Sequence, residues 1–140
     1  MSDEHFMRVA IDEAAKATHP FGAAVVINGE IISKAGSGEE FDPTAHAEIK
    51  AIRVACKSLK QNKLTGAVLY STCEPCPMCF AAAWWADINK IVYGIALQES
   101  SELYGPEILI DTHQMNKAGG STIEIHGGLL KKEVLALYKD

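Results

Sequence analysis

Apolar residues recur at helical spacing at the beginning of the chain. Within residues 3–17, Phe6, Ala10 and Ala14 fall on one face of a helix. The pattern stops at Pro20, a residue type that cannot continue a helix. We therefore expect an amphipathic first helix over 3–17.

Two runs of strand-forming residues follow and meet at a turn signal. Residues 21–28 and 30–35 flank the pair Asn28-Gly29. Asn-Gly is the strongest short-range signal for a β-hairpin, because both residues tolerate the positive φ of a tight turn. We expect two antiparallel strands. A single buried helix is the poorer interpretation, because the Asn-Gly pair lies in its middle.

The middle of the chain alternates between helical and strand patterns. Thr44 is a plausible N-cap for a helix of about 16 residues, since the apolar residues after it form one stripe. Residues 67–71 predict a short buried strand, and 76–86 predict a helix that is apolar on nearly every side and therefore buried. A further strand is expected over 90–94.

The last third of the chain is harder to assign. Residues 97–122 show no clean period and are expected to run over one end of the sheet. A strand over 122–126 and a helix over 129–138 close the predicted order. Strands alternating with helices in this way predict an α/β fold, in which a mixed sheet lies between helices.

Composition limits the class of protein. The chain has 140 residues, 48% of them apolar, which fits a single domain spanning 1–140. No apolar run reaches the roughly 18 residues that span a bilayer, and the first residues are too acidic for a secretory signal. A formal charge of −5 argues against broad electrostatic capture of nucleic acid. We expect a cytoplasmic protein with no membrane partner.

Two closely spaced cysteines are the first sign of chemistry. Cys76 and Cys79 share one face of the predicted helix, at its N-terminus, where thiolates are favoured. Pro75 and Pro77 suit a first helical turn, because their missing N–H groups cost little there. The functional interpretation is a pair of zinc ligands; the alternative is a reduced pair in the core. The distant Cys56 is expected to be core filler.

His46 supplies a third ligand from the start of the preceding helix. One imidazole and two thiolates leave a fourth tetrahedral position for water, which distinguishes a catalytic zinc site from a structural one. Glu48 is the candidate to move protons, although residues two apart on a helix point about 200° apart. Side chains in an opening turn lean toward the N-terminus, so both could reach one point. An ordinary surface glutamate is the alternative.

Cys73 offers a competing pair, because Cys73-x-x-Cys76 has the same spacing. We reject it as a ligand, since it precedes Pro75 in the expected strand-to-helix turn and does not share a helical face with Cys79. A fourth protein ligand would also exclude water and make the zinc structural.

The sequence HAE followed by PCPMC resembles the zinc-dependent cytidine deaminase superfamily. The resemblance runs from PFGAAVV to the strand at Tyr93, and implies a three-layer αβα fold with a central mixed five-stranded sheet. It also implies one zinc ion per chain on His46, Cys76 and Cys79, with Glu48 as proton shuttle. The backbone N–H groups of Ala47 and Cys76 would bind and orient the substrate.

Within that superfamily, the sequence around both motifs is most similar to that of bacterial guanine deaminases. This resemblance implies conversion of guanine to xanthine with release of ammonia. Phe21 and Trp85 would flank the planar base, and the carboxylate of Glu107 would bind the edge of the purine. For Trp85, packing in the core is the alternative. It also implies a homodimer, with the C-terminal tail capping a site. His113 could touch the substrate.

Two departures from the family pattern leave the substrate open. Relatives usually carry Gly-x-Asn before HAE, where this chain has Gly36-Ser37-Gly38. The position after the Trp-Ala pair, where relatives often carry an Arg, is Asp87 in this chain. The alternatives are a tRNA adenosine-to-inosine deaminase, a deaminase of cytosine or another heterocycle, and a zinc-stabilised binding domain that would not need Glu48. The acidic charge and the C-terminal sequence argue against the tRNA enzyme, so a small nucleobase or nucleoside is the expected partner.

Overall fold

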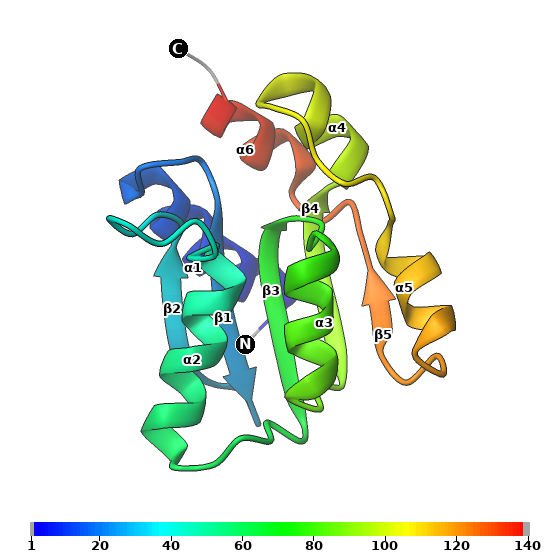
Figure 1. The fold of residues 1–140 in the computed structure, drawn as a ribbon. Coiled ribbons are helices and arrows are strands. Elements are labelled where there is room, and N and C mark those ends of the chain that lie inside the picture. Colours follow the sequence, from blue (N-terminus) through cyan, green and yellow to red (C-terminus); the bar gives the residue numbers. More distant parts are fainter. Residues whose placement is uncertain (1, 139–140) are drawn as a thin grey trace.

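A mixed five-stranded sheet runs through the middle of the molecule, in the order β2-β1-β3-β4-β5 (Figure 1). The computed structural model describes residues 2–138. The strands are β1 Gly22–Ile27, β2 Glu30–Gly36, β3 Ala67–Cys73, β4 Lys90–Ile95 and β5 Glu124–His126. β1 is antiparallel to both β2 and β3, whereas β3, β4 and β5 are parallel. The predicted fold class, with its mixed five-stranded sheet, is confirmed.

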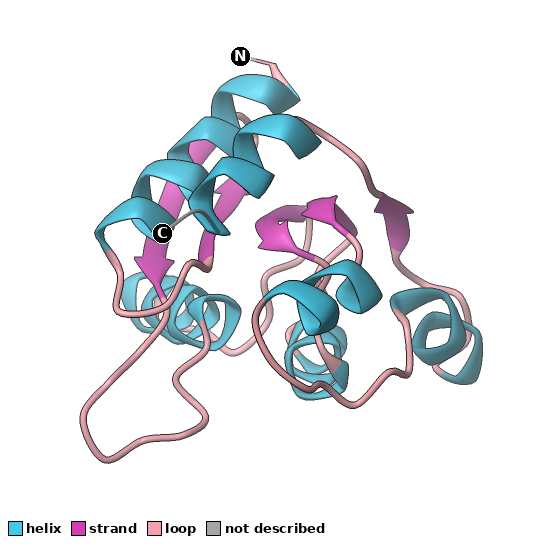
Figure 2. Ribbon diagram, turned by 90° about the horizontal axis from the view of Figure 1, so that it is seen from above, coloured by secondary structure: helices cyan, strands magenta, loops and turns pink. Residues whose placement is uncertain are grey.

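Helices cover both faces of this sheet. Figure 2 shows α1 on one side of the strands and α2 and α3 on the other. The helices are α1 Asp3–Lys16, α2 Ala47–Leu59, α3 Pro77–Trp85, α4 Leu97–Leu103, α5 Thr112–Ala118 and α6 Lys131–Leu135, the last followed by a 3₁₀ turn at Ala136–Tyr138. None of the helices in residues 2–138 is both long and apolar enough to cross a bilayer.

Alternation along the strands divides the core between the two faces. Ala23 and Val25 of β1 pack with α2 and α3, whereas Ala24 and Val26 pack with α1. Successive side chains of a strand point to opposite faces, so a strand buried on both sides shows an unbroken apolar run. This explains why the run around β1 has no polar position.

The hairpin between β1 and β2 forms as predicted. Asn28 and Gly29 have φ values of 51° and 76°, both positive, as a two-residue hairpin turn of this kind requires. Ile27 then pairs with Glu30 across the turn.

The second helix begins later than predicted. Its N-cap is His46, and not Thr44. The cause is local, because Asp42 Oδ1 accepts hydrogen bonds from Thr44 N at 2.9 Å and Thr44 Oγ1 at 2.6 Å. These bonds hold the residues before His46 in a turn, which delays the helix.

The prediction of full burial for the third helix is wrong. Trp84 and Trp85, at its C-terminal end, are 38% and 68% exposed. The segment over 97–122 also contains two helices, α4 and α5, that its pattern did not reveal. Each has seven residues, too few for a 3.6-residue period to repeat clearly.

Candidate metal and catalytic site

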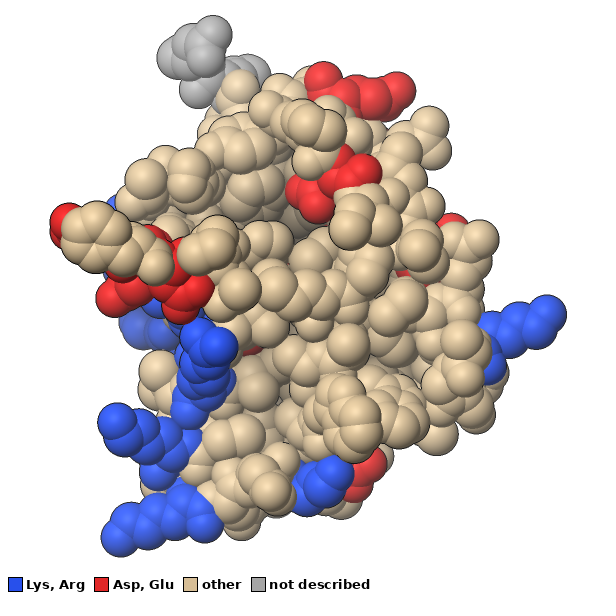
Figure 3. Space-filling view, in the orientation of Figure 1, with Lys and Arg blue, Asp and Glu red and all other residues tan. Residues whose placement is uncertain are grey.

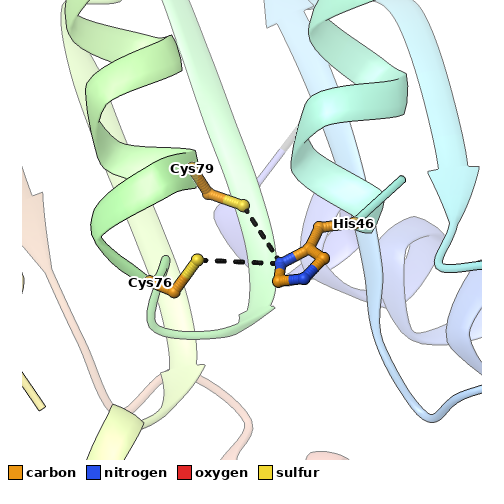
Figure 4. Close-up of side chains that lie close together, drawn as sticks. All are labelled: His46, Cys76 and Cys79. Carbon is orange, nitrogen blue, oxygen red and sulfur yellow. Dashed lines mark hydrogen bonds between the residues drawn. The ribbon is translucent and has the colours of Figure 1, made fainter. Parts of the chain in front are cut away.

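His46, Cys76 and Cys79 come together where α2 and α3 begin, at the same edge of the sheet (Figure 4). His46 and Cys76 are the N-cap residues of the two helices, and both have extended backbone. Neither side chain makes the capping hydrogen bond that N-cap residues usually provide. The ring and the thiol are therefore free to face each other.

The three side chains fit a tetrahedral zinc ion. His46 Nδ1 lies 3.6 Å from Cys76 Sγ and 3.5 Å from Cys79 Sγ. Zinc bonds of about 2.3 Å to sulfur and about 2.0–2.1 Å to nitrogen would place these atoms about 3.6 Å apart. The three ligand atoms all lie within 4.8 Å of one another, so a single ion reaches all three without rearrangement.

Hydrogen bonds among these three side chains shift the pKa of each of them. The hydrogen bond from Cys79, followed by that from His46, lowers the pKa of Cys76 to about 4, although burial opposes this. The pKa of Cys79 is raised, first by its hydrogen bond to Cys76 and then by burial. The hydrogen bond to Cys76 raises the pKa of His46. This donor set suits a metal ion, because thiolate is the form that binds it.

Cys73 takes no part in this group. It is the last residue of β3, 5% exposed, and its thiol donates to the carbonyl of Glu74 at 3.4 Å. Burial raises its pKa, so the thiol form is favoured.

Glu48 is buried in the first turn of α2, with 6% of the residue exposed. Desolvation raises the pKa of its carboxyl group to about 7, with a further contribution from Cys76. A carboxyl group with a pKa near neutrality can both take up and release a proton. Because His46 lies outside the helix as its N-cap, the 200° separation expected on a regular helix does not apply to this pair.

A cavity of about 1110 Å³ opens in front of these residues. Of the residues proposed for the site from the sequence, Phe21, His46, Glu48, Cys76 and Glu107 line it, and so does Cys73, which was rejected as a ligand. Ala47 is fully buried as the first residue of α2. The structure therefore brings predicted residues from four separate segments of the chain to one concave site.

Two other predicted residues lie elsewhere. Trp85 is not part of the cavity lining; it lies at the opposite end of α3, with its ring 5.0 Å from that of Trp84. The structure thus does not place it across a base from Phe21 within one chain. His113 is exposed on α5, also outside the lining.

Tyr104, an aromatic residue that the sequence did not single out, lines the cavity beside Phe21. Tyr104 meets Phe21 edge to face, with ring centroids 5.2 Å apart, and its hydroxyl contacts His19 Nδ1. Tyr138 packs on Phe21 from another side at 6.1 Å. No local pattern marks Tyr104 or His19, because they are brought to the site by the tertiary fold.

The cavity is strongly acidic. Within residues 2–138, six carboxyl groups line it and no Lys or Arg does, although Lys50 and Arg53, outside the lining, pair with Glu39 and Asp42. The six carboxyl groups belong to Glu39, Glu40, Asp42, Glu48, Glu74 and Glu107. On the face shown in Figure 3, acidic atoms gather in the upper half, whereas Lys and Arg lie mainly in the lower half. The negative potential of this lining favours neutral or cationic ligands over phosphates.

Comparison with known proteins places these features in a family. Residues 1–95 match the family described as the cytidine and deoxycytidylate deaminase zinc-binding region. The chain is 47% identical over 96 residues to the tRNA-specific adenosine deaminase of Agrobacterium fabrum, covering 64% of this chain and 63% of that protein. It is 38% identical over 109 residues to the guanine deaminase of Bacillus subtilis, covering 73% and 70%. The chain thus matches slightly less than two thirds of the Agrobacterium protein.

A solved structure shows the same arrangement over nearly the whole chain. A protein from a study of A-to-I editing by tRNA:A34 deaminases superposes with a TM-score of 0.80 at 34% identity. The superposition covers 95% of this chain and 98% of the other.

Proposed function

The chain belongs to the cytidine and deoxycytidylate deaminase zinc-binding family, and on that premise we propose that it removes the exocyclic amine of a nucleobase as ammonia. The substrate that we propose first is guanine, which would be converted to xanthine. The observation that carries this proposal is the cavity in front of the proposed metal ligands. Its lining within residues 2–138 holds the buried Glu48, whose pKa is raised to about 7, and contains carboxyl groups but no Lys or Arg. The active unit is proposed to be a single domain over 1–140 that acts in the cytoplasm.

In the proposed reaction, different residues bind the metal, transfer protons and orient the base. His46, Cys76 and Cys79 would hold one zinc ion, which supplies a Lewis acid that makes water acidic enough to react at neutral pH. Glu48 would take one proton from the attacking water on a carboxylate oxygen and deliver it to a ring nitrogen. It would then carry a second proton, from the hydroxyl now on the ring carbon, to the amine, which departs as ammonia. Its burial suits this role, since the carboxyl group must be protonated and deprotonated in each cycle. The N–H groups of Ala47 and Cys76 orient the base.

The cavity lining supports a substrate without phosphate. Glu107 is half-buried, and desolvation raises the pKa of its carboxyl group. Its oxygens can accept hydrogen bonds from the N–H groups of a purine edge, and Phe21 offers an aromatic surface to the ring. A phosphate would instead meet several carboxylates, which costs binding energy.

Deamination of adenosine in tRNA is the second candidate. It is favoured by the 47% identity to the tRNA-specific adenosine deaminase of Agrobacterium fabrum. The acidic lining of the cavity opposes it, because protein affinity for RNA depends on contacts to phosphates.

We also propose a homodimer. Large apolar side chains are exposed on α3 and on the segment before α5, namely Trp84, Trp85, Ile108, Leu109 and Ile110. Burying them against a second copy would remove apolar surface from water. Sedimentation equilibrium should give twice the chain mass, and a monomer at all concentrations would contradict the proposal.

Ammonia release tests the proposed reaction. Zinc-loaded protein is incubated with guanine, cytosine, adenine, their nucleosides and a tRNA anticodon stem-loop, with Glu48→Gln as the inactive control. The proposal expects ammonia and xanthine from guanine with no RNA present. Inosine in the stem-loop without turnover of any free base would establish the second candidate. Bound zinc with no turnover of any substrate would favour a zinc-stabilised binding domain.

A further inference from the structure

One buried carboxylate holds three segments of the chain together behind the cavity. Glu74 lies between β3 and α3, two residues before Cys76, and only 4% of it is exposed. Its Oε1 accepts a hydrogen bond from Leu97 N at 2.9 Å, and its Oε2 accepts from Thr112 N at 2.8 Å and Thr112 Oγ1 at 2.7 Å. Its own N–H donates to Ile95 O at 2.8 Å.

The two residues that donate to Glu74 mark the beginnings of α4 and α5. Leu97 is the first residue of α4 and Thr112 the first of α5, and both are almost completely buried. The segment 104–111 lies between these helices and carries Tyr104 and Glu107 to the cavity. One side chain therefore holds the start of α4, which leads into this cavity wall, and the start of α5, which follows it.

Apart from the contacts that Tyr104 makes with Phe21, His19 and Tyr138, the wall has little packing of its own. None of the residues in 104–111 is buried in the chain, and Ile108, Leu109 and Ile110 are 68%, 54% and 44% exposed. A segment without buried apolar contacts takes its position from its ends. The helix before it and the helix after it each begin with a residue that donates to Glu74, which lies two residues before the proposed metal ligand Cys76 in the chain.

We infer that Glu74 is a positioning residue that sets the distance and orientation of the wall over 104–111 relative to the metal ligands, and thereby the affinity for the base. The role in affinity rests on the proposed function. A carboxylate is required because three donors converge on it, and a group with N–H donors of its own leaves one of them unpaired.

Glu74→Gln tests this with little change in shape. The amide can accept at only one oxygen, so either Leu97 N or Thr112 loses its acceptor. Thr112→Val removes one of the three hydrogen bonds and serves as a milder second variant. Glu133→Gln is the matched control, because Glu133 is an exposed carboxylate that pairs with Arg8, away from the cavity.

Hydrogen exchange on zinc-loaded protein without substrate provides a readout that does not depend on the proposed activity. We expect exchange over 97–112 to accelerate by about tenfold or more in Glu74→Gln, less in Thr112→Val, and not in Glu133→Gln. Exchange in β3 and α3 should stay as in the unmodified protein, and the zinc content should remain at one ion per chain.

Steady-state kinetics with guanine separates positioning from stability. Displacement of the wall in Glu74→Gln should raise KM by about tenfold while kcat changes little. The proposed contact between Glu107 and the base is present in both the ground state and the transition state, so its loss weakens both equally. Unchanged exchange over 97–112 in Glu74→Gln would overturn the inference. So would acceleration spread over the whole chain with loss of zinc, which would make Glu74 merely structural. If guanine is not turned over, the proposed function fails while the exchange result still decides the inference.

Discussion

Glu48 presents a carboxyl group with 6% exposure in the lining of the cavity, together with His46 and Cys76. Burial is the largest cause of its raised pKa, and it comes from the packing of the α2 N-terminus against the sheet. The sequence shows only that a glutamate follows His46 by two residues. The structure adds that His46 is an N-cap, which lets both side chains serve one site.

Glu48→Gln should retain zinc and fold but lose between about 10² and 10⁴ of the deamination rate, the usual contribution of a general acid–base group. The amide has the same shape but cannot carry the proton. Turnover numbers and zinc content measured together check this, with the exposed Glu30→Gln as a control. Retained turnover in Glu48→Gln would remove Glu48 from the mechanism.

The ligand assignment predicts different results for neighbouring cysteines. Cys79→Ala removes one of the three donors and should abolish stoichiometric zinc, because two protein ligands hold the ion poorly. Cys73→Ala should retain a full complement of zinc, since its thiol is bonded to a backbone carbonyl instead. Elemental analysis of both variants decides the matter. Full zinc in Cys79→Ala, or its loss in Cys73→Ala, would contradict the ligand set.

Sequence reasoning reached the two motifs that stand at helix starts and missed contacts between distant segments that no motif marks. Cys76 and Cys79 were predictable because three-residue spacing places two thiols on one helical face. Glu74 lies in the same motif, yet its partners Leu97 and Thr112 are more than 20 residues away. Such contacts leave no periodic signal.

At the scale of elements, α1 and β1 pack unusually closely. A Cβ atom added at Gly22 would lie 1.9 Å from Ala10 O and 2.6 Å from Ala14 N. The small residues on that face of α1 allow the helix backbone to approach the strand. The apolar stripe predicted for residues 3–17 indicated that one face of the helix is buried. It did not indicate that this face packs against the glycine at position 22.

Gly22→Ala should therefore lower the free energy of unfolding by about 3 kcal/mol or more, because backbone atoms must move to admit the methyl group. Gly105→Ala is the control, since nothing lies within 4 Å of its added Cβ. It should change the free energy of unfolding by less than about 0.5 kcal/mol. Urea denaturation of both variants measures the difference, and equal stabilities would contradict the packing described for α1.

At the scale of the whole molecule, the metal site joins two parts of the fold. His46 follows the β1–β2 hairpin and is the N-cap of α2. Cys76 follows β3 and is the N-cap of α3, and Cys79 lies within α3. A bound ion therefore crosslinks two helices on one face of the sheet. This arrangement followed from the sequence, because both motifs stand at predicted helix starts; the wall over 104–111 did not.

Removing zinc with a chelator should destabilise the protein. Free zinc at a thousandfold excess over its dissociation constant contributes about 4 kcal/mol, so the melting temperature should fall by on the order of 10 °C. Calorimetry with and without chelator measures this, and Cys79→Ala should show no chelator effect. A melting temperature independent of chelator in the zinc-loaded protein would mean that the ion does not bind the folded state preferentially.

X-ray absorption at the zinc edge of the purified protein tests the central claim most directly. The account predicts two sulfur ligands at about 2.3 Å, one imidazole nitrogen at about 2.0–2.1 Å, and one further light-atom ligand from solvent. A spectrum with three or four sulfur ligands and no place for solvent would show a closed structural site and contradict the assignment as a deaminase.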